Sequence, residues 1–284
     1  MAIEQSGEPD TSAAPVAPDA MTPMAVEERR AALDTIAAEV RVCTRCRLWQ
    51  TRTNAVPGEG HPDTEVIFVG EGPGQHEDIQ GRPFVGAAGS FLTELIRSIA
   101  WQREEVFITN VVKCRPPGNR DPEADEIVAC APYLQRQLAV LDPALVVTLG
   151  RHSLQTFMPG ARIGAVHGTA RPVDPGTGAV QANAYAMYHP AAAFRQQALR
   201  ETLQLDMTGI PAALESARSG RLSQPEPLEP LFPEPGAARA SVPHLVDPEP
   251  AESPVPDLPR ERELALARVP ATTELSDDQM SLFR

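Results

Sequence analysis

Short apolar runs that alternate with helical patterns restrict the fold of this chain more than any other feature. Residues 65–70 (EVIFVG), 105–112 (EVFITNVV) and 144–150 (ALVVTLG) are rich in β-branched residues, and residues 184–188 (AYAMY) form a weaker fourth run. Such runs are typical of strands that are buried on both faces of a parallel sheet. Helical spacing occurs before, between and after them, at residues 26–42, 88–100, 123–140, 151–157 and 191–208.

This alternation predicts an α/β fold, namely a three-layer α/β/α sandwich with a central four-stranded parallel sheet. In such a fold the loops after the carboxyl ends of the strands meet at one edge of the sheet. Three polar or glycine-rich loops follow predicted strands, at residues 70–74, 110–120 and 189–190. We therefore expect these loops to converge on one site.

Composition limits the fold to the middle of the 284-residue chain. Residues 1–25 are rich in Ala and Pro, and residues 211–284 carry 13 of the 30 prolines and no long apolar run. Such segments bury too little apolar surface to offset the entropy of ordering, so we expect both to be disordered. The ordered domain is expected at residues 26–210.

The charge balance and the hydropathy exclude several classes of protein. The net charge is −13, most of it in the two terminal segments, which argues against a general nucleic-acid coat but leaves room for a local basic patch. No stretch of 18 apolar residues exists, and no basic region precedes an apolar one at the N-terminus, so neither a membrane span nor a secretory signal is expected. We expect a cytoplasmic monomer.

Four cysteines, Cys43, Cys46, Cys114 and Cys130, predict a closed metal site. Two residues separate Cys43 from Cys46, a ligand hairpin that zinc and iron–sulfur sites share, and 15 residues separate Cys114 from Cys130. The alternatives are a redox pair at Cys43 and Cys46, and Cys130 as a small core residue. The spacing leaves zinc and iron–sulfur open, although the long second loop favours a cluster.

A set of motifs in a fixed order resembles the family 4 (iron–sulfur) uracil-DNA glycosylases of bacteria and archaea, over residues 35–208. The motifs are CTRC (43–46), GEGPG (70–74), GRPFVG (81–86), TNVVKCRPP (109–117), Cys130 and HP (189–190). The resemblance implies a 4Fe–4S cluster on the four cysteines. It also implies a monofunctional enzyme of base excision repair that hydrolyses the N-glycosidic bond of deoxyuridine in single- or double-stranded DNA, associated with the nucleoid during repair.

Three residues are predicted to bind the base. Gly72 lies in the loop that lines the uracil pocket in the family, Phe84 offers a face on which a flipped pyrimidine stacks, and Asn110 offers an amide that reads N3–H and O4 of uracil. Each has a simpler alternative: a turn glycine, a core phenylalanine and an asparagine that caps a strand.

Three residues are predicted to act in catalysis. The resemblance implies that His189 contacts uracil O2, where negative charge builds as the base departs. Related families have an Asp at the position of Gly72, so an Asp-based mechanism does not transfer. The resemblance points instead to Glu71, largely through its backbone, and to Glu77, which would hold the water beside a dissociative, oxocarbenium-like transition state.

Four residues are predicted to contact DNA. Arg115 and Arg120 would bind the backbone, Arg195 would hold a phosphate, and Phe194 would fill the gap left by the flipped base. Solvated surface arginines are the alternative. Residues 115–121 lack the basic insert and the His with which a related family captures DNA covalently, so covalent capture is not expected.

The last residues carry a separate motif. Gln279, Met280, Ser281, Leu282 and Phe283 resemble the short peptide that bacterial replication proteins insert into the sliding clamp, at the end of a long tether. A chance match is the alternative.

Two other functions of the whole protein also stay open: a glycosylase for hypoxanthine or mismatched thymine, and a non-catalytic DNA-binding replication accessory protein.

Overall fold

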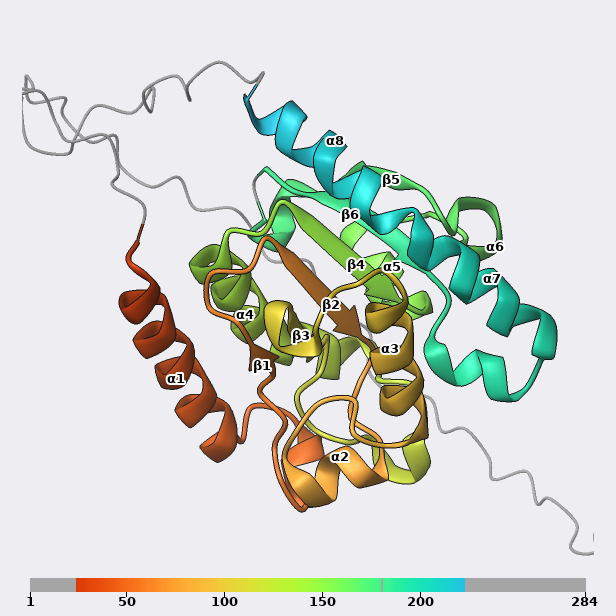
Figure 1. Ribbon diagram of the computed structural model, residues 1–284. Helices are drawn as coiled ribbons and strands as arrows, with labels where there is room; N and C mark the ends of the chain where they lie inside the picture. Colours follow the sequence, from red (N-terminus) through yellow and green to blue (C-terminus); the bar gives the residue numbers. More distant parts are fainter. Residues whose placement is uncertain (1–23, 180, 223–284) are drawn as a thin grey trace, which may run out of the picture. The chain divides into compact units, whose positions relative to one another are not determined.

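The computed structural model of the chain describes residues 24–179 and 181–222 (Figure 1). All of these residues belong to one unit, Met1–Leu228. The predicted clamp-binding peptide at residues 279–283 and most of the N-terminal segment expected to be disordered lie outside the described residues. None of the described helices has the length and the apolar character that crossing a membrane requires.

A six-stranded sheet with the strand order β1-β3-β2-β4-β6-β5 forms the middle of the fold. Its four central strands are parallel, as predicted: β3 (Phe107–Asn110), β2 (Val66–Gly70), β4 (Leu145–Leu149) and β6 (Asn183–Met187). The prediction missed the two antiparallel edge strands, β1 (Glu59–Gly60) and β5 (Ala170–Pro172). These strands are two and three residues long and carry no apolar run, so they leave no periodic signal.

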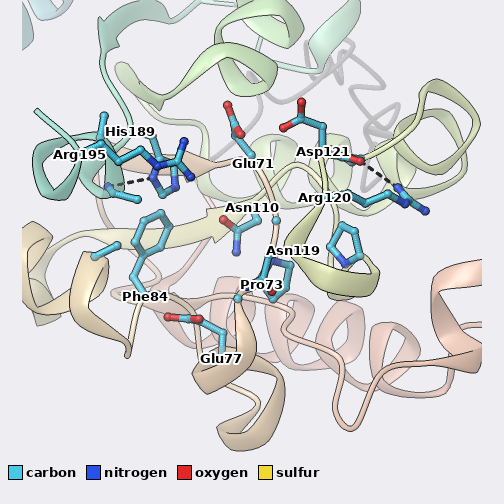
Figure 2. Close-up of a pocket in the computed structure, with 17 residues that line it drawn as sticks. Glu71, Pro73, Glu77, Phe84, Asn110, Asn119, Arg120, Asp121, His189 and Arg195 are labelled. Atoms are coloured by element: carbon cyan, nitrogen blue, oxygen red, sulfur yellow. Dashed lines mark hydrogen bonds between the residues drawn. The ribbon is translucent and has the colours of Figure 1, made fainter. Parts of the chain in front are cut away.

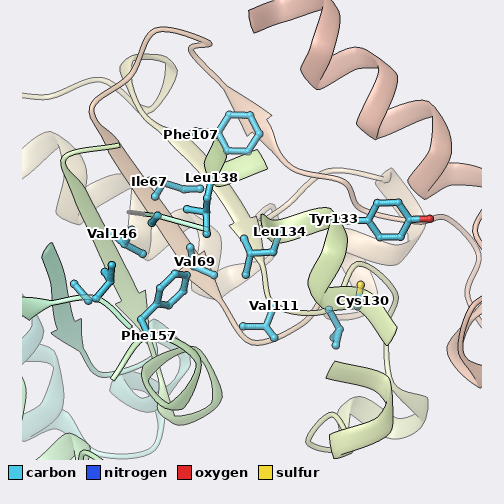
Figure 3. Close-up of a cluster of buried hydrophobic side chains, with 14 of the residues drawn as sticks. Ile67, Val69, Phe107, Val111, Cys130, Tyr133, Leu134, Leu138, Val146 and Phe157 are labelled. Atoms are coloured by element: carbon cyan, nitrogen blue, oxygen red, sulfur yellow. The ribbon is translucent and has the colours of Figure 1, made fainter. Parts of the chain in front are cut away.

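Neighbouring residues of the central strands face opposite layers, which confirms the predicted sandwich. Ile67 and Val69 pack with α1 (Val26–Val42), α4 (Ala124–Leu141) and α5 (Arg151–Phe157), as Figure 3 shows in part. Val66 and Phe68 pack with α3 (Ala87–Ser98), α7 (Gln197–Thr208) and α8 (Ile210–Leu222). This alternation follows from the two-residue period of a strand.

The remaining elements are short and connect these layers. They are α2 (Gln75–Gln80), α6 (Ile163–Val166) and the 3₁₀ turns η1 (Arg47–Gln50), η2 (Arg103–Glu105), η3 (Pro117–Asn119), η4 (Pro175–Thr177) and η5 (Pro190–Phe194). The helix expected at residues 191–208 is thus divided into η5 and α7. The division falls at Gln196, whose backbone is extended (φ −141°).

Helix α8 runs past residue 210, where the ordered domain was expected to end, and continues to Leu222. It buries four residues against the sheet: Ile210, Ala213, Leu214 and Ala217. These residues recur at helical spacing, but small alanines and the neighbouring Pro211 hid the pattern. A proline is tolerated in the first turn of a helix, because the N–H that it lacks has no partner there.

The register of the sheet brings the predicted loops together. Gly70 at the end of β2 pairs with Asn110 at the end of β3, and the Val111 N–H continues the pairing by donating to the Gly70 carbonyl (2.9 Å). On the other side, the N–H of Gly150 donates to the carbonyl of Met187 (3.0 Å). The carboxyl ends of the four central strands therefore form one edge.

Candidate active site

A cavity of about 410 Å³ opens at this edge of the sheet (Figure 2). The structure brings together there every residue predicted for base binding and catalysis: Glu71, Gly72, Glu77, Phe84, Asn110 and His189. Arg120 and Arg195 also line the cavity. The side chains come from four separate segments of the chain, and this arrangement makes the cavity a built site instead of a surface irregularity.

Asn110 has an unpaired polar atom at the cavity. The residue is 1% exposed, and its Oδ1 is buried without a hydrogen-bond partner among the described residues. An unpaired buried acceptor costs about 1–3 kcal/mol, so this atom is suited to a donor on a bound molecule.

Gly70 allows Asn110 and Phe84 to lie side by side. A Cβ at position 70 would stand 2.3 Å from Oδ1 of Asn110 and 2.6 Å from Cζ of Phe84, both far inside van der Waals contact. Any other residue at this position would push the amide and the ring apart. The glycine of the first motif is therefore required by the two side chains that face the cavity.

Phe84 is held in a strained backbone conformation. Its φ is 51°, in the left-handed region that side chains other than glycine rarely adopt, and such strain persists where the surroundings fix it. The loop is fixed from two sides. Oε1 of Glu77 accepts hydrogen bonds from the N–H groups of Val85 and Gly86 (2.9 Å each), and Nη2 of Arg103 donates to the Pro83 carbonyl (2.5 Å).

His189 lies beside Phe84 in the lining of the cavity. The two rings are stacked, with centroids 5.7 Å apart and an angle of 27° between their planes. Nδ1 of His189 accepts a hydrogen bond from the Ala191 N–H (3.1 Å), which leaves the proton of the neutral imidazole on Nε2. Burial lowers the pKa of His189 below its ordinary value of 6.5, although the charges of Glu71 and Glu77 oppose this. The ring therefore presents a neutral N–H donor.

The carboxylate of Glu71 is used inside the protein. Its Oε1 accepts a hydrogen bond from the N–H of His152 (3.0 Å), in the first turn of α5. A carboxylate in this position caps the free N–H groups at the start of the helix. The side chain of Glu71 thus anchors the loop that forms one wall of the cavity.

The four cysteines also come together, away from the cavity. Cys43, Cys46, Cys114 and Cys130 line one small space of about 10 Å³, and all four are free thiols. They come from the end of α1 and the turn after it, the loop after β3, and α4. Burial raises the pKa of the Cys130 thiol to about 11, an effect that a bound metal centre would reverse by its positive charge.

Three N–H donors point at the sulfurs. The N–H of Arg45 donates to Sγ of Cys43 (3.5 Å), that of Lys113 to Sγ of Cys130 (3.2 Å), and Nη1 of Arg52 to Sγ of Cys114 (3.0 Å). Four cysteines, three of which receive an N–H donor at sulfur, are the ligand set and the surroundings that iron–sulfur clusters use. The residues present therefore fit such a group.

Residues 57–206, more than half of the chain, match the model of the uracil DNA glycosylase superfamily. The chain is 48% identical over 190 residues to the type-4 uracil-DNA glycosylase of Saccharolobus solfataricus, covering 65% of this chain and 87% of that protein. It is 45% identical over 146 residues to the type-4 enzyme of Thermotoga maritima, covering 51% and 76%. It is 44% identical over 183 residues to that of Archaeoglobus fulgidus, covering 63% and 91%.

The chain belongs to the type-4 uracil-DNA glycosylases. The resemblance seen in the sequence motifs is thereby confirmed. The family model, at residues 57–206, covers every residue that lines the cavity.

The residues predicted to contact DNA differ in their exposure and in their contacts with other side chains. Phe194 is 56% exposed and packs edge-on against Phe91, with the ring centroids 6.3 Å apart. Arg195 is exposed at the rim of the cavity. Arg120, by contrast, pairs with buried Glu126 (2.6 Å). The hydrogen bond from Arg120 lowers the pKa of Glu126 to about 2, although burial opposes this shift. Arg115 donates to Oδ1 of Asn119 (2.7 Å).

Sequence reasoning missed two features of the glycosylase site. One is the Ala191 N–H that fixes the tautomer of His189, which no side-chain pattern announces. The other is Lys113, the only lysine of the chain, which is 1% exposed. Burial lowers its pKa to about 7. A single lysine in a chain otherwise rich in arginine was the available signal.

Proposed function

We propose that this glycosylase hydrolyses the N-glycosidic bond of deoxyuridine in DNA, releasing uracil and leaving an abasic site. The unpaired Oδ1 of Asn110 beside the ring of Phe84 carries the proposal. A base enters such a pocket only after it has left the helix stack. There it would stack on Phe84, a contact worth about 1–3 kcal/mol per base.

The amide of Asn110 would select the base. Oδ1 would accept the N3–H of uracil, and Nδ2 would donate to O4. Cytosine has an acceptor at N3 and an amino group at position 4, so two polar groups would be left unpaired in this pocket. Sites that hydrogen-bond a substrate reject the analogue that lacks the complementary groups strongly.

His189 would stabilise the departing base. As the bond between C1′ and N1 breaks, its electron pair leaves with uracil, and the negative charge spreads to O2. The neutral Nε2–H of His189 would donate to that oxygen, in the role of an oxyanion hole. Because Ala191 fixes the ring, the donor needs no reorganisation during the reaction.

Glu77 would hold the water that adds to C1′ of the oxocarbenium-like sugar. Its Oε1 is already used by the loop of Phe84, so the second oxygen, Oε2, is the one for water. The water oxygen would bond to C1′, and its proton would pass to solvent by way of the carboxylate. Glu71 would contribute through its backbone, because its side chain caps α5.

The four cysteines would hold a 4Fe–4S cluster. When bound, the cluster supplies metal–thiolate bonds that join α1, the end of β3 and α4. No residue of the cysteine site lines the cavity, so we assign the cluster a structural role. An absorbance band at about 400 nm, together with iron analysis, tests this assignment.

Around the cavity, Phe194 would fill the gap left by the flipped base, while Arg115, Arg120 and Arg195 would contact the DNA backbone. We propose that the protein acts as a monomer at the nucleoid.

Residues 279–283 would dock on the sliding clamp. Deleting residues 279–284 should then abolish clamp binding and leave activity on short oligonucleotides unchanged; clamp binding that survives the deletion contradicts this role.

One assay tests the main proposal. Full-length protein is incubated with matched oligonucleotides that contain uracil, hypoxanthine, a G·T mismatch or only normal bases, and the released base is identified. We expect free uracil, and we expect the Asn110→Ala variant to lose it. Release of hypoxanthine or thymine in place of uracil would instead favour a different base, and binding without release of any base would favour an accessory protein.

A further inference from the structure

Lys113 occupies an unusual position for a charged side chain. It is 1% exposed, and burying an amine is costly unless every N–H finds an acceptor. Its Nζ donates to Oγ1 of Thr109 (2.6 Å), the carbonyl of Asn110 (2.8 Å) and Oε1 of Gln137 (2.7 Å). These three bonds use all three hydrogens of an ammonium group, so the side chain has none left for a substrate or a metal.

The acceptors of Lys113 belong to a closed network behind the cavity. Oγ1 of Thr109 and Nε2 of Gln137 both donate to the Pro57 carbonyl, at 3.0 and 2.7 Å. The network therefore joins the end of β3, helix α4 and the segment before β1. Lys113 lies at its centre, and its side chain folds back toward the end of the preceding strand, β3.

One of the three bonds bears directly on Asn110. The carbonyl that Nζ holds belongs to the residue whose amide faces the cavity, at the last position of β3. Fixing this peptide group fixes the direction in which the Asn110 side chain leaves the backbone. Supporting residues must hold such a group to within about 0.5 Å for it to act well.

The backbone of Lys113 is anchored in turn. Its N–H donates to Sγ of Cys130, and its carbonyl accepts from the N–H of Val56 (2.8 Å). The residue thus links the cysteine site to Asn110, since its N–H contacts Cys130 and its side chain holds the carbonyl of Asn110.

We propose that Lys113 is a positioning residue that holds Asn110 in its base-reading orientation and thereby sets the preference for uracil over cytosine. This inference rests on the proposed role of Asn110. Arginine cannot replace the lysine, since its planar guanidinium does not direct three hydrogen bonds from one nitrogen. Methionine fills a similar volume but leaves all three acceptors without a donor.

The test compares Lys113→Met with the unaltered holoenzyme. The readouts are kcat/KM for uracil excision and inhibition of that reaction by free uracil and by free cytosine. We expect kcat/KM to fall by about 100-fold, the scale of a 1 Å misplacement, and the preference for free uracil to fall with it. Iron content should stay unchanged. A variant with the preference of the unaltered enzyme would overturn the proposal.

Leu134→Ala is the matched control, because Leu134 is buried in the same helix as Gln137, belongs to the core cluster and has no polar side-chain atom. It should lower the thermal midpoint without changing the preference for uracil. If it lowers the preference as much as Lys113→Met does, the effect is general loosening and the proposal fails. Should Lys113→Met not fold, Thr109→Val removes one acceptor and should shift the preference in the same direction by a smaller factor.

A double-mutant cycle separates this proposal from the one on which it rests. If Lys113 acts through Asn110, then Lys113→Met should no longer change the preference in an Asn110→Ala background. If Asn110→Ala alone keeps the preference for uracil, the base-reading role itself is wrong. If Asn110→Ala loses the preference and Lys113→Met keeps it, the base-reading role stands and the positioning role is wrong.

Discussion

The cavity and the cysteine site are joined by one short segment, from Asn110 in the cavity to Cys114 in the cysteine site. They differ in size and in how far their polar groups are already paired. The cavity measures about 410 Å³, leaves Oδ1 of Asn110 without a partner and contains Phe84 at a φ of 51°. The cysteine site encloses about 10 Å³, and three of its four sulfurs receive N–H donors. The cavity thus has an unpaired polar atom that a ligand could bind, whereas most sulfurs of the cysteine site already receive hydrogen bonds from the protein.

This difference assigns ligand binding to the cavity and stabilisation of the fold to the cysteine site. An unpaired acceptor and a strained backbone cost stability, and they are found where a ligand would relieve them. The cysteine site lies where three distant segments need a cross-link. Substitutions in the cavity should therefore reduce activity at nearly constant stability, and substitutions at the cysteines should do the reverse.

The largest effect on activity is expected from His189→Ala. Removing one donor of an oxyanion hole costs about 10²–10³ in kcat, and His189 would be such a donor in the leaving-group role proposed for it. Single-turnover release of uracil measures the loss, and the thermal midpoint should change little. A loss of less than tenfold would remove His189 from the chemistry.

A smaller loss, about 100-fold, is expected from Glu77→Gln, at the low end of acid–base effects. The amide oxygen of Gln can still accept from the N–H groups of Val85 and Gly86, so the loop of Phe84 and the thermal midpoint should be kept. The charge that holds the water would be lost. Full single-turnover activity in this variant contradicts the water-holding role and leaves Glu77 as a support of the loop.

Cys130→Ser should give the opposite result. Losing the metal centre removes a cross-link of the kind that contributes about 2–5 kcal/mol, so the thermal midpoint should fall by about 10 °C. The absorbance at about 400 nm should disappear. Below the melting range, the remaining uracil release per folded molecule should exceed that of His189→Ala. If the cysteine variant is the less active of the two, the cluster is more than structural.

The strands and the cysteines could be predicted because their signals are local or compositional. A buried parallel strand needs an apolar run, as at residues 145–149, and four thiolates in one chain have few alternatives to a common metal. The role of Lys113, the support that Glu77 gives to the loop of Phe84 and the contact of Ala191 with His189 could not be predicted in the same way. What each does depends on which atom of which partner it meets after folding, and the sequence does not contain those distances.

The smallest effect concerns pH. Burial lowers the pKa of His189 below 6.5, so the neutral ring persists in the folded protein at pH values where an unfolded chain would already be protonated. Protonation puts a hydrogen on Nδ1, opposite the Ala191 N–H, and breaks the bond that orients the ring. The uracil-excision rate should thus stay level through pH 6.5 and fall only at lower pH, where the ring becomes protonated in the folded protein. By linkage, His189 contributes stability above its unfolded-state pKa. This contribution declines as the pH falls from the unfolded-state pKa to the lower folded-state pKa, because only the unfolded state then binds the proton.

His189→Gln should flatten the dependence of the thermal midpoint on pH in this interval, whereas Cys130→Ser should lower the midpoint and keep the slope. An unchanged slope in His189→Gln would show that the histidine is not held neutral by its surroundings, and the separation between a cavity that tunes its groups and a cysteine site that stabilises the fold would lose its electrostatic support.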